Sequence, residues 1–363
     1  MSAIGEASDT AYARSFWNRL WRRKAAFVAL VFLAALYGAL PFVEIIAPYD
    51  PETRSNEAIY MPPTAIHLFH KGTFLGPFVY AKKTTIDLTS FQREFTDDLT
   101  RPLKLRVLCQ GDGYFLWGLF EARVHLLCPP ETGRLHLFGA DRLGRDIFSR
   151  VVYGARISLT IGLFGVALSF VLGCLLGGLA GYVGGWVDAG ILRLIELLRA
   201  LPELPLWMAL AAALPANWPP IWIYFGITLI LGLLDWPGLA RAVRAKILSL
   251  REEDYVVAAE LLGASRLRVL VRHMLPNFSG HLIVSLTLAI PGMILGETAL
   301  SFLGLGLRPP VVSWGVLLGD AQNISAVELY PWLLIPLAPV VLVVLAFNVL
   351  GDGLRDTLDP FTH

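Results

Sequence analysis

Long apolar runs separated by short polar segments dominate the chain. A membrane-crossing helix needs about 20 mostly apolar residues, and six runs meet or approach that length. We expect them to form transmembrane helices over residues 25–46, 157–181, 191–214, 221–239, 282–307 and 333–350. Composition agrees, because 55% of the 363 residues are hydrophobic and only 16% are charged, whereas soluble domains carry about 25% charged residues. The pattern predicts an all-α integral membrane protein. A net charge of +1 gives no basis for a nucleic-acid partner.

Basic residues predict the orientation of these helices. Lys and Arg collect in the short cytoplasmic loops of membrane proteins. The segment before the first run is basic, with Arg14, Arg19, Arg22, Arg23 and Lys24. We therefore expect a cytoplasmic segment over residues 1–24 and, after six crossings, a cytoplasmic tail over residues 351–363. No small-residue cleavage site follows the first run, so we interpret residues 25–46 as a retained anchor.

The orientation places residues 47–156 outside the cytoplasm. The polar, β-prone stretches of residues 47–137 predict an inserted extracytoplasmic domain of partly β character. Cys109 and Cys128 lie in this domain, and an oxidising compartment permits a disulfide between them. Such a bridge would stabilise the domain by about 3 kcal/mol, and two buried free thiols are the alternative. The histidines of the domain lack a metal-ligand spacing, so we expect no metal site.

The last part of this outer region has a helical pattern. Residues 139–156 place apolar side chains at helical spacing with arginines between them. We expect an amphipathic helix that lies on the outer membrane surface. A helix that packs against the outer domain is the alternative.

Small residues recur at every fourth position of the second run. They are Gly165, Ser169, Gly173, Gly177 and Gly181. A stripe of small residues lets two helix backbones approach closely in lipid. We therefore expect a helix-packing face, whose partner lies either in this chain or in another subunit.

Charged residues within the apolar runs are candidates for function, because they are costly in a membrane. Arg193, Glu196, Arg199 and Glu203 open the third run with a spacing that permits pairing among themselves. We place Asp235 at the cytoplasmic end of the fourth run. The fifth run contains a single charged side chain, a carboxylate.

That carboxylate is Glu297, which lies well inside the fifth run after Pro291 and Gly292. One interpretation is a pathway-lining group that contacts substrate. The other, which we favour, is a buried carboxyl that is hydrogen-bonded to a neighbouring helix.

The loop over residues 240–280 carries the most specific local pattern. Gly263 can end a short helix in a left-handed turn, Ser265 can cap a second helix, and Pro276 marks that helix's end or a kink. We therefore expect two short helices joined by a tight bend just inside the membrane. Tyr255, Val256, Ala259 and Leu262 have a spacing close to one helical face. An ordinary helical loop is the alternative.

These residues resemble the EAA loop of ABC-importer permeases. Ala258, Ala259, Gly263 and Pro276 match its pattern, whereas Val257 stands where that family has Glu and His273 stands at a hydrophobic position. Further motifs resemble the second permease of the dipeptide/oligopeptide/nickel family: GADRLGRD (139–146), YGAR (153–156), RHMLPN (272–277), LSFLGLG (300–306) and GLRDTLDP (353–360).

The resemblance implies a type I ABC importer permease fold and an assembly in the inner membrane. It implies that residues 157–350 are the permease core, which pairs with a homologous permease. Two ATPase subunits would bind the cytoplasmic loops, and an extracytoplasmic binding protein would deliver peptide. The loop contacts implied for coupling are Tyr255, Val256, Ala258, Ala259, Leu262, Gly263 and Pro276.

The chain itself is not expected to be an enzyme. It contains no Gly-x-x-x-x-Gly-Lys-Ser/Thr phosphate loop, so ATP and Mg²⁺ would bind the partner subunits. We find no catalytic triad and no metal-ligand cluster in the sequence. The alternatives are a nickel or metal-chelate importer of the same family and a passive channel. A membrane-embedded enzyme would need paired catalytic groups, and Glu297 has no obvious partner of that kind.

Overall fold

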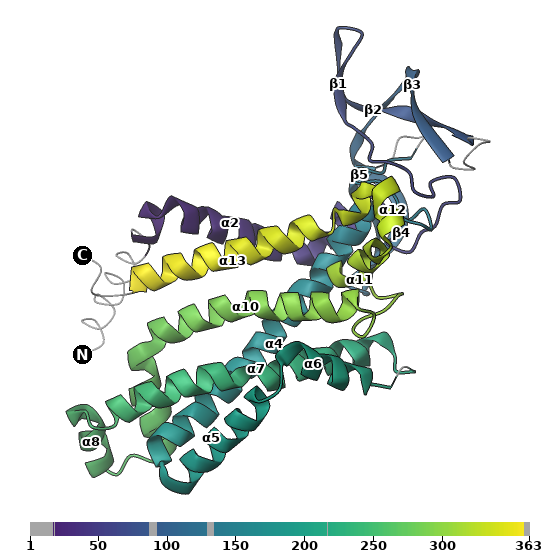
Figure 1. The fold of residues 1–363 in the computed structure, drawn as a ribbon. Coiled ribbons are helices and arrows are strands. Elements are labelled where there is room, and N and C mark those ends of the chain that lie inside the picture. Colours follow the sequence, from purple (N-terminus) through teal and green to yellow (C-terminus); the bar gives the residue numbers. More distant parts are fainter. Residues whose placement is uncertain (1–16, 18, 87–92, 129–133, 216, 359–363) are drawn as a thin grey trace. The chain divides into compact units, whose positions relative to one another are not determined.

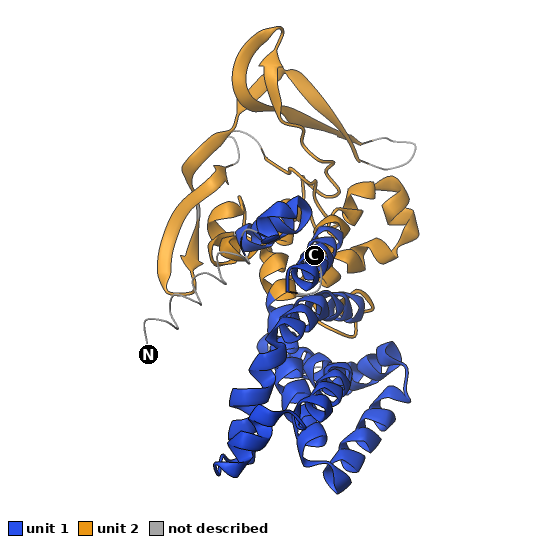
Figure 2. Ribbon diagram, turned by 90° about the vertical axis from the view of Figure 1, so that its left-hand side faces the viewer, with its two compact units in different colours: residues 1–36, 160–300, 341–363 blue, residues 37–159, 301–340 orange. Residues whose placement is uncertain are grey.

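The computed structural model of the protein describes residue 17 and residues 19–86, 93–128, 134–215 and 217–358 (Figure 1). The expected N-terminal segment and C-terminal tail therefore lie partly outside the described residues. The chain divides into two compact units (Figure 2). The first contains residues 1–36, 160–300 and 341–363, and the second contains residues 37–159 and 301–340.

Helices make up most of the described chain. The longer ones are α2 (Lys24–Ala39), α4 (Ile147–Val183), α5 (Gly185–Arg199), α6 (Glu203–Ala212), α7 (Pro220–Leu250), α8 (Asp254–Leu261), α10 (Ser279–Phe302) and α13 (Leu337–Leu358). The shorter ones are η1 (Leu40–Phe42), α3 (Val43–Ile46), α9 (Arg266–Arg268), η2 (Val269–Met274), η3 (Leu275–Phe278), α11 (Trp314–Gly319), η4 (Asp320–Gln322), α12 (Ile324–Leu329) and η5 (Pro331–Leu334).

Within the described ranges, five helical segments are long and apolar enough to cross a membrane. They are Lys24–Ile46, Ile147–Val183, Pro220–Leu250, Val269–Phe302 and Pro331–Leu358. Each contains most of an expected helix, although α4 begins ten residues earlier and α7 ends later than the apolar pattern predicts. The fourth of these segments ends at Phe302, two residues before Gly304, which takes a left-handed conformation (φ +73°).

The third expected helix, residues 191–214, is not continuous. The chain breaks after Arg199 and resumes as α6 at Glu203, with Pro202 as the residue before the new helix. Proline lacks a backbone N–H and disfavours helical geometry at the residue before it. The apolar pattern did not reveal this break, because Leu201 and Pro202 do not interrupt its hydrophobicity.

The small-residue stripe of α4 faces α7 in the same chain. A Cβ atom added at Gly173 would lie 2.9 Å from Leu239 Cβ, and one added at Gly177 would lie 2.8 Å from Ala240 Cα. At the two ends of the stripe, Gly165 lies beside Thr228 and Gly181 beside Ile247. Residue numbers rise together along both helices, so α4 and α7 run parallel.

Two further contacts orient the first unit. A Cβ atom at Gly351 would meet Leu288 and one at Gly280 would meet Leu358, so α10 and α13 run antiparallel. Arg23 Nη1 lies 2.6 Å from Asp356 Oδ2. The start of the first apolar helix is therefore next to the end of the last one.

The second unit contains the strands. β1 (His67–His70), β2 (Thr73–Ile86) and β3 (Arg93–Lys104) form an antiparallel sheet in that order, and β4 (Arg106–Leu116) pairs antiparallel with β5 (Phe120–Cys128). Pro102 pairs with Tyr80 beside an irregularity between Tyr80 and Ala81, which is where a strand tolerates proline. The five strands named here all lie within residues 67–128.

The segment before α4 is a polar turn rather than the expected amphipathic helix. Asp146 caps α4, since its Oδ2 accepts from Ser149 N over 2.7 Å. Asp141 Oδ2 accepts from Arg145 Nε over 2.7 Å and from Arg150 Nη1 over 2.5 Å. Arg145 and Arg150 are buried. Arg145 and Arg150 therefore hold this turn together and do not form a polar face toward solvent, whereas Arg142 is exposed.

Candidate functional site

The cytoplasmic loop forms two short helices joined by a tight turn. α8 ends at Leu261, and Gly263 takes the expected left-handed conformation, with φ of +79°. Gly263 N donates to Glu260 O over 2.9 Å and Ala264 N donates to Ala259 O over 3.1 Å. Such bonds satisfy the last carbonyls of a helix that ends on glycine.

The second helix starts at the residue that the sequence indicates. Ser265 Oγ accepts from Arg268 N over 3.4 Å and so caps α9. α9 continues through the π-helical η2 and the 3-10 turn η3 into α10. Pro276 lies in the first turn of η3, where a missing N–H is tolerated. Pro276 therefore marks a change of helical geometry within this segment rather than its end.

Val256 fixes α8 to the rest of the first unit. Its side chain is fully buried in a cluster with Val243, Ile247, Leu270 and Met274, against which Ala259 also packs. Asn277 Nδ2 donates to Tyr255 Oη over 2.8 Å. The cluster joins α8 to both α7 and the segment that leads into α10.

The exposed face of α8 therefore differs from the one that the spacing predicts. Val256 and Ala259 point into the chain, whereas Val257, Ala258, Leu261 and Leu262 are exposed. The Leu261 and Leu262 side chains are 83% and 89% exposed. We call residues 257, 258, 261 and 262 the apolar ridge. The sequence pattern missed it because the buried side of such a short helix depends on the helices around it.

A cavity lined by both polar and apolar residues lies among α4, the end of α5, α7 and α10. Its volume is about 290 Å³, and its polar lining residues are Ser169, Arg199, Asp235, His281 and Ser285. Ser169 Oγ donates to Asp235 Oδ2 over 3.3 Å. A Cβ atom added at Gly238 would lie 2.9 Å from Arg199 Nη2. The guanidinium therefore lies one helical turn from Asp235 on α7.

Sequence reasoning did not identify this cavity. Asp235 lies near the middle of α7, because that helix continues to Leu250. Arg193 pairs with Glu196 over 3.5 Å, as the spacing permits, but Arg199 faces α7. A second contact joins α5 to α7, since Arg244 Nη2 donates to Asp188 Oδ2 over 2.5 Å.

Glu297 is fully buried inside the first unit. The preceding glycine of α10, Gly296, faces Trp207 of α6 and Leu231 of α7. A side chain that lines a pathway between two subunits is expected to be accessible in one subunit alone. The burial of Glu297 therefore favours a structural carboxyl within the helix bundle.

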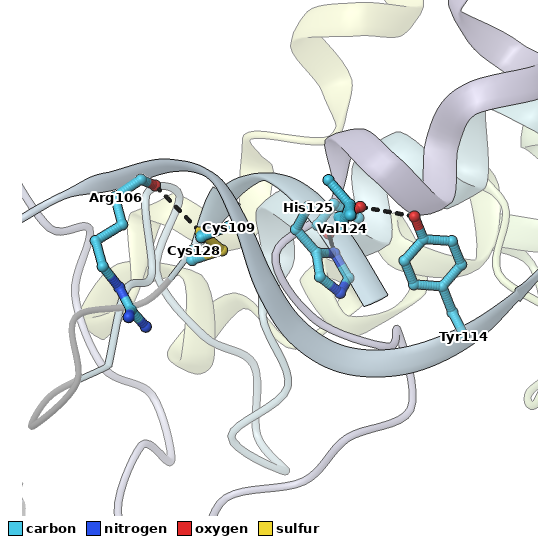
Figure 3. The surroundings of a disulfide bond; sticks show 7 residues. Arg106, Cys109, Tyr114, Val124, His125 and Cys128 are labelled. Carbon is cyan, nitrogen blue, oxygen red and sulfur yellow. Dashed lines mark hydrogen bonds between the residues drawn. A yellow bond between two sulfur atoms is a disulfide. The ribbon is translucent and has the colours of Figure 1, made fainter. Parts of the chain in front are cut away.

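The two cysteines of the outer region form a disulfide across the β4–β5 hairpin (Figure 3). Cys109 and Cys128 have Cα atoms 6.3 Å apart and are separated by 19 residues. Cys174 is free and buried. Among the residues that the structure describes, no group of three or more His, Cys, Asp or Glu side chains is arranged to hold a metal ion.

Comparison with known proteins identifies the family. The model of the binding-protein-dependent transport system inner membrane component matches residues 173–363. A second family model, the N-terminal TM domain of oligopeptide transport permease C, matches residues 11–63.

Relatives of this chain have related names. A dipeptide transport system permease protein of Bacillus subtilis is 40% identical over 280 residues, which cover 73% of this chain and 86% of the relative. An oligopeptide transport system permease protein of Haemophilus influenzae is 41% identical over 232 residues, covering 64% of this chain and 72% of the relative. The chain therefore belongs to the family of binding-protein-dependent transport system inner membrane components.

Proposed function

We propose that this chain is the membrane-spanning permease subunit of an ATP-driven importer that takes up peptides. Its relatives are named as dipeptide and oligopeptide permeases, which favours peptides over nickel. The observation that carries the proposal is the cytoplasmic loop. There α8 presents the exposed apolar ridge on one side, while Val256 on its other side is buried against the rest of the first unit. A passive channel has no use for such a contact.

The proposed permease crosses the membrane six times. Parallel neighbours such as α4 and α7 need a connection that returns along their whole length, and α5 and α6 together supply it. Arg23 and Asp356 form an ion pair, which supports an even number of crossings with both ends on one side. The basic N-terminal segment supports a cytoplasmic location for that side.

Reporter fusions test this topology. A reporter that is active only in the cytoplasm is expected to be active after His363 and inactive after Thr85, in the strand-rich outer region. Activity of both fusions would mean an even number of crossings between the two positions, whereas the six-crossing arrangement requires five, and would therefore refute that arrangement.

The ridge is proposed to bind an ATPase subunit. A short apolar helix in a groove is a common mode of recognition, and packed elements move as units. Because Val256 joins α8 to α7 and to the start of α10, a displacement of the ATPase would move those helices together. Two ATPase subunits, a homologous permease and an extracytoplasmic binding protein would complete the importer.

Introduction of a charge into the apolar ridge tests this binding. Leu262→Glu places a carboxylate on the 89% exposed ridge position, so it should release the ATPase subunits and abolish uptake without unfolding the chain. Ile324→Glu in α12 is the matched control, because Ile324 is 81% exposed and lies in the other unit. Co-purification of the ATPases with Leu262→Glu at the control level would refute the contact.

The cavity that contains Arg199 and Asp235 supports peptides as the substrate. Arg199 and Asp235 offer one positive and one negative group, which complement the carboxylate and ammonium ends of a peptide. A hydrogen bond to a charged group contributes about 1.5–3 kcal/mol, or about a 10- to 150-fold change in binding. Arg199→Gln or Asp235→Asn should therefore slow dipeptide uptake about tenfold or more. Arg193→Gln, on the same helix, is the control and should leave uptake unchanged.

A further inference from the structure

The β4–β5 hairpin ends in an exposed apolar tip. Residues 114–120 contain no charged side chain. The turn itself is tight, since Trp117 and Gly118 both have positive φ, at 54° and 71°. The most exposed side chains are Phe115 (65%), Trp117 (52%), Leu119 (73%) and Phe120 (60%). Aromatic and leucine side chains grouped at one protruding turn indicate a binding surface and not scattered exposure.

Two contacts place this hairpin along the end of the first apolar helix. Near the base, His125 Nδ1 lies 2.7 Å from Ala47 O, and Figure 3 shows the His125 ring beside the strand that carries Cys109. At the tip, Trp117 Nε1 donates to Pro41 O over 2.8 Å. The Trp117 ring also lies near that of Phe42, with centroids 6.5 Å apart.

These contacts give the depth of the tip relative to the helix. Ala47 follows the apolar segment Lys24–Ile46, whereas Pro41 lies within it. Residues 41 and 47 are six positions apart along the 3-10 turn η1 and the short helix α3, which is somewhat less than two turns of an α-helix. The hairpin therefore runs back along this segment, and its tip contacts the segment about two turns before its end.

We propose that the β4–β5 tip inserts among the lipids and anchors the strand-rich unit to the membrane. Its occupant is lipid because the tip contacts a residue that is itself at membrane depth. Trp and Phe favour the membrane interface, and an apolar face can sit about 5–10 Å into the headgroup boundary. The proposed orientation makes this the outer leaflet, but the contact with lipid does not depend on that orientation.

The charged residues fix how far the tip inserts. Glu121 and Arg123 form an ion pair of 3.2 Å and are both exposed. Glu121 follows Phe120 directly and Arg123 comes two residues later, so both lie at the level of the headgroups when the tip is buried. An open strand edge is not tolerated in the hydrocarbon core. The tip therefore reaches the interface and does not cross it.

A spin label on the tip tests the insertion. The label is attached to Leu119→Cys in a Cys174→Ala background, and the chain with its partner subunits is placed in phospholipid nanodiscs. Power saturation then compares collisions with oxygen, which concentrates in lipid, and with a water-soluble nickel chelate. We expect oxygen to dominate several-fold at residue 119. The control label, Thr85→Cys at an exposed position of β2, should show the reverse.

Two results would overturn the proposal. The nickel chelate reaching residue 119 as readily as residue 85 would place the tip in water. Shielding of residue 119 from both reagents would show that protein covers it. A label at Phe115→Cys provides a second reading if the first variant does not fold. Because the test measures only the surroundings of the hairpin, it can fail while peptide uptake stands.

Discussion

Replacement of Gly263 by valine tests whether the left-handed turn after α8 is needed to orient that helix. Gly263 has φ of +79°, and a Cβ atom added there would meet nothing within 4 Å. The substitution therefore introduces no clash, and its cost is the left-handed backbone alone. That cost is about 1–2 kcal/mol for an L-residue with a side chain, which lowers the population of the bent turn by about 5- to 30-fold. The bond from Ala264 N to Ala259 O would be lost as the turn relaxes.

The expected outcome is a chain that still inserts and still binds its binding protein. Uptake should fall, and either substrate-stimulated ATP hydrolysis should be lost or the ATPases should dissociate. Gly72→Val is the control, because Gly72 has φ of +81° and equally open surroundings in the turn between β1 and β2. Gly263→Asn should retain part of the activity, since Asn adopts this conformation more readily. Normal uptake by Gly263→Val in reconstituted vesicles would show that the turn does not aim a coupling element.

Three further predictions concern the packing of α4, the disulfide and the stability of the strand-rich unit. Gly177→Ala puts a methyl group 2.8 Å from an α7 backbone atom and should destabilise the chain by about 1–3 kcal/mol in thermal unfolding, whereas Gly190→Ala meets open space and should not. Alkylation of unreduced, denatured chain should label neither Cys109 nor Cys128, and labelling of both would exclude the bridge. Hydrogen bonds from the threonine two residues on lower the pKa of Asp98 to about 2. The contribution of the ionised Asp98 carboxylate to the stability of the folded state should be complete above about pH 4 and be lost as the pH falls toward 2. Asp98→Asn should remove this pH dependence from the unfolding of the strand-rich unit.

Hydrophobicity predicts the long helices well because a membrane imposes a single length requirement on each crossing. Five of the expected runs coincide with long apolar helices. The remaining run, residues 191–214, is not a continuous helix because the chain breaks at Pro202, and this break depends on backbone geometry and not on polarity. The ends of α4 and α7 were also missed, since both helices continue into polar sequence at Ile147 and Leu250.

Local signals in the loop were informative for a different physical reason. A left-handed turn at Gly263 and a cap at Ser265 depend on a few neighbouring residues, so the sequence contains most of what determines them. The face of α8 that is exposed depends on Val256 packing against distant residues, such as Val243 and Met274. The cavity beside Asp235 likewise requires the parallel arrangement of α4 and α7, which no local pattern specifies.

The central claim is ATP-driven uptake of peptides, and vesicle transport tests it most directly. The chain is reconstituted with its partner permease and ATPase subunits, ATP is enclosed on the cytoplasmic side, and the binding protein with a radiolabelled dipeptide is added outside. The account predicts uptake that requires both ATP and the binding protein and that Leu262→Glu abolishes. Uptake that proceeds without ATP, or uptake of nickel with none of the dipeptide, would contradict it.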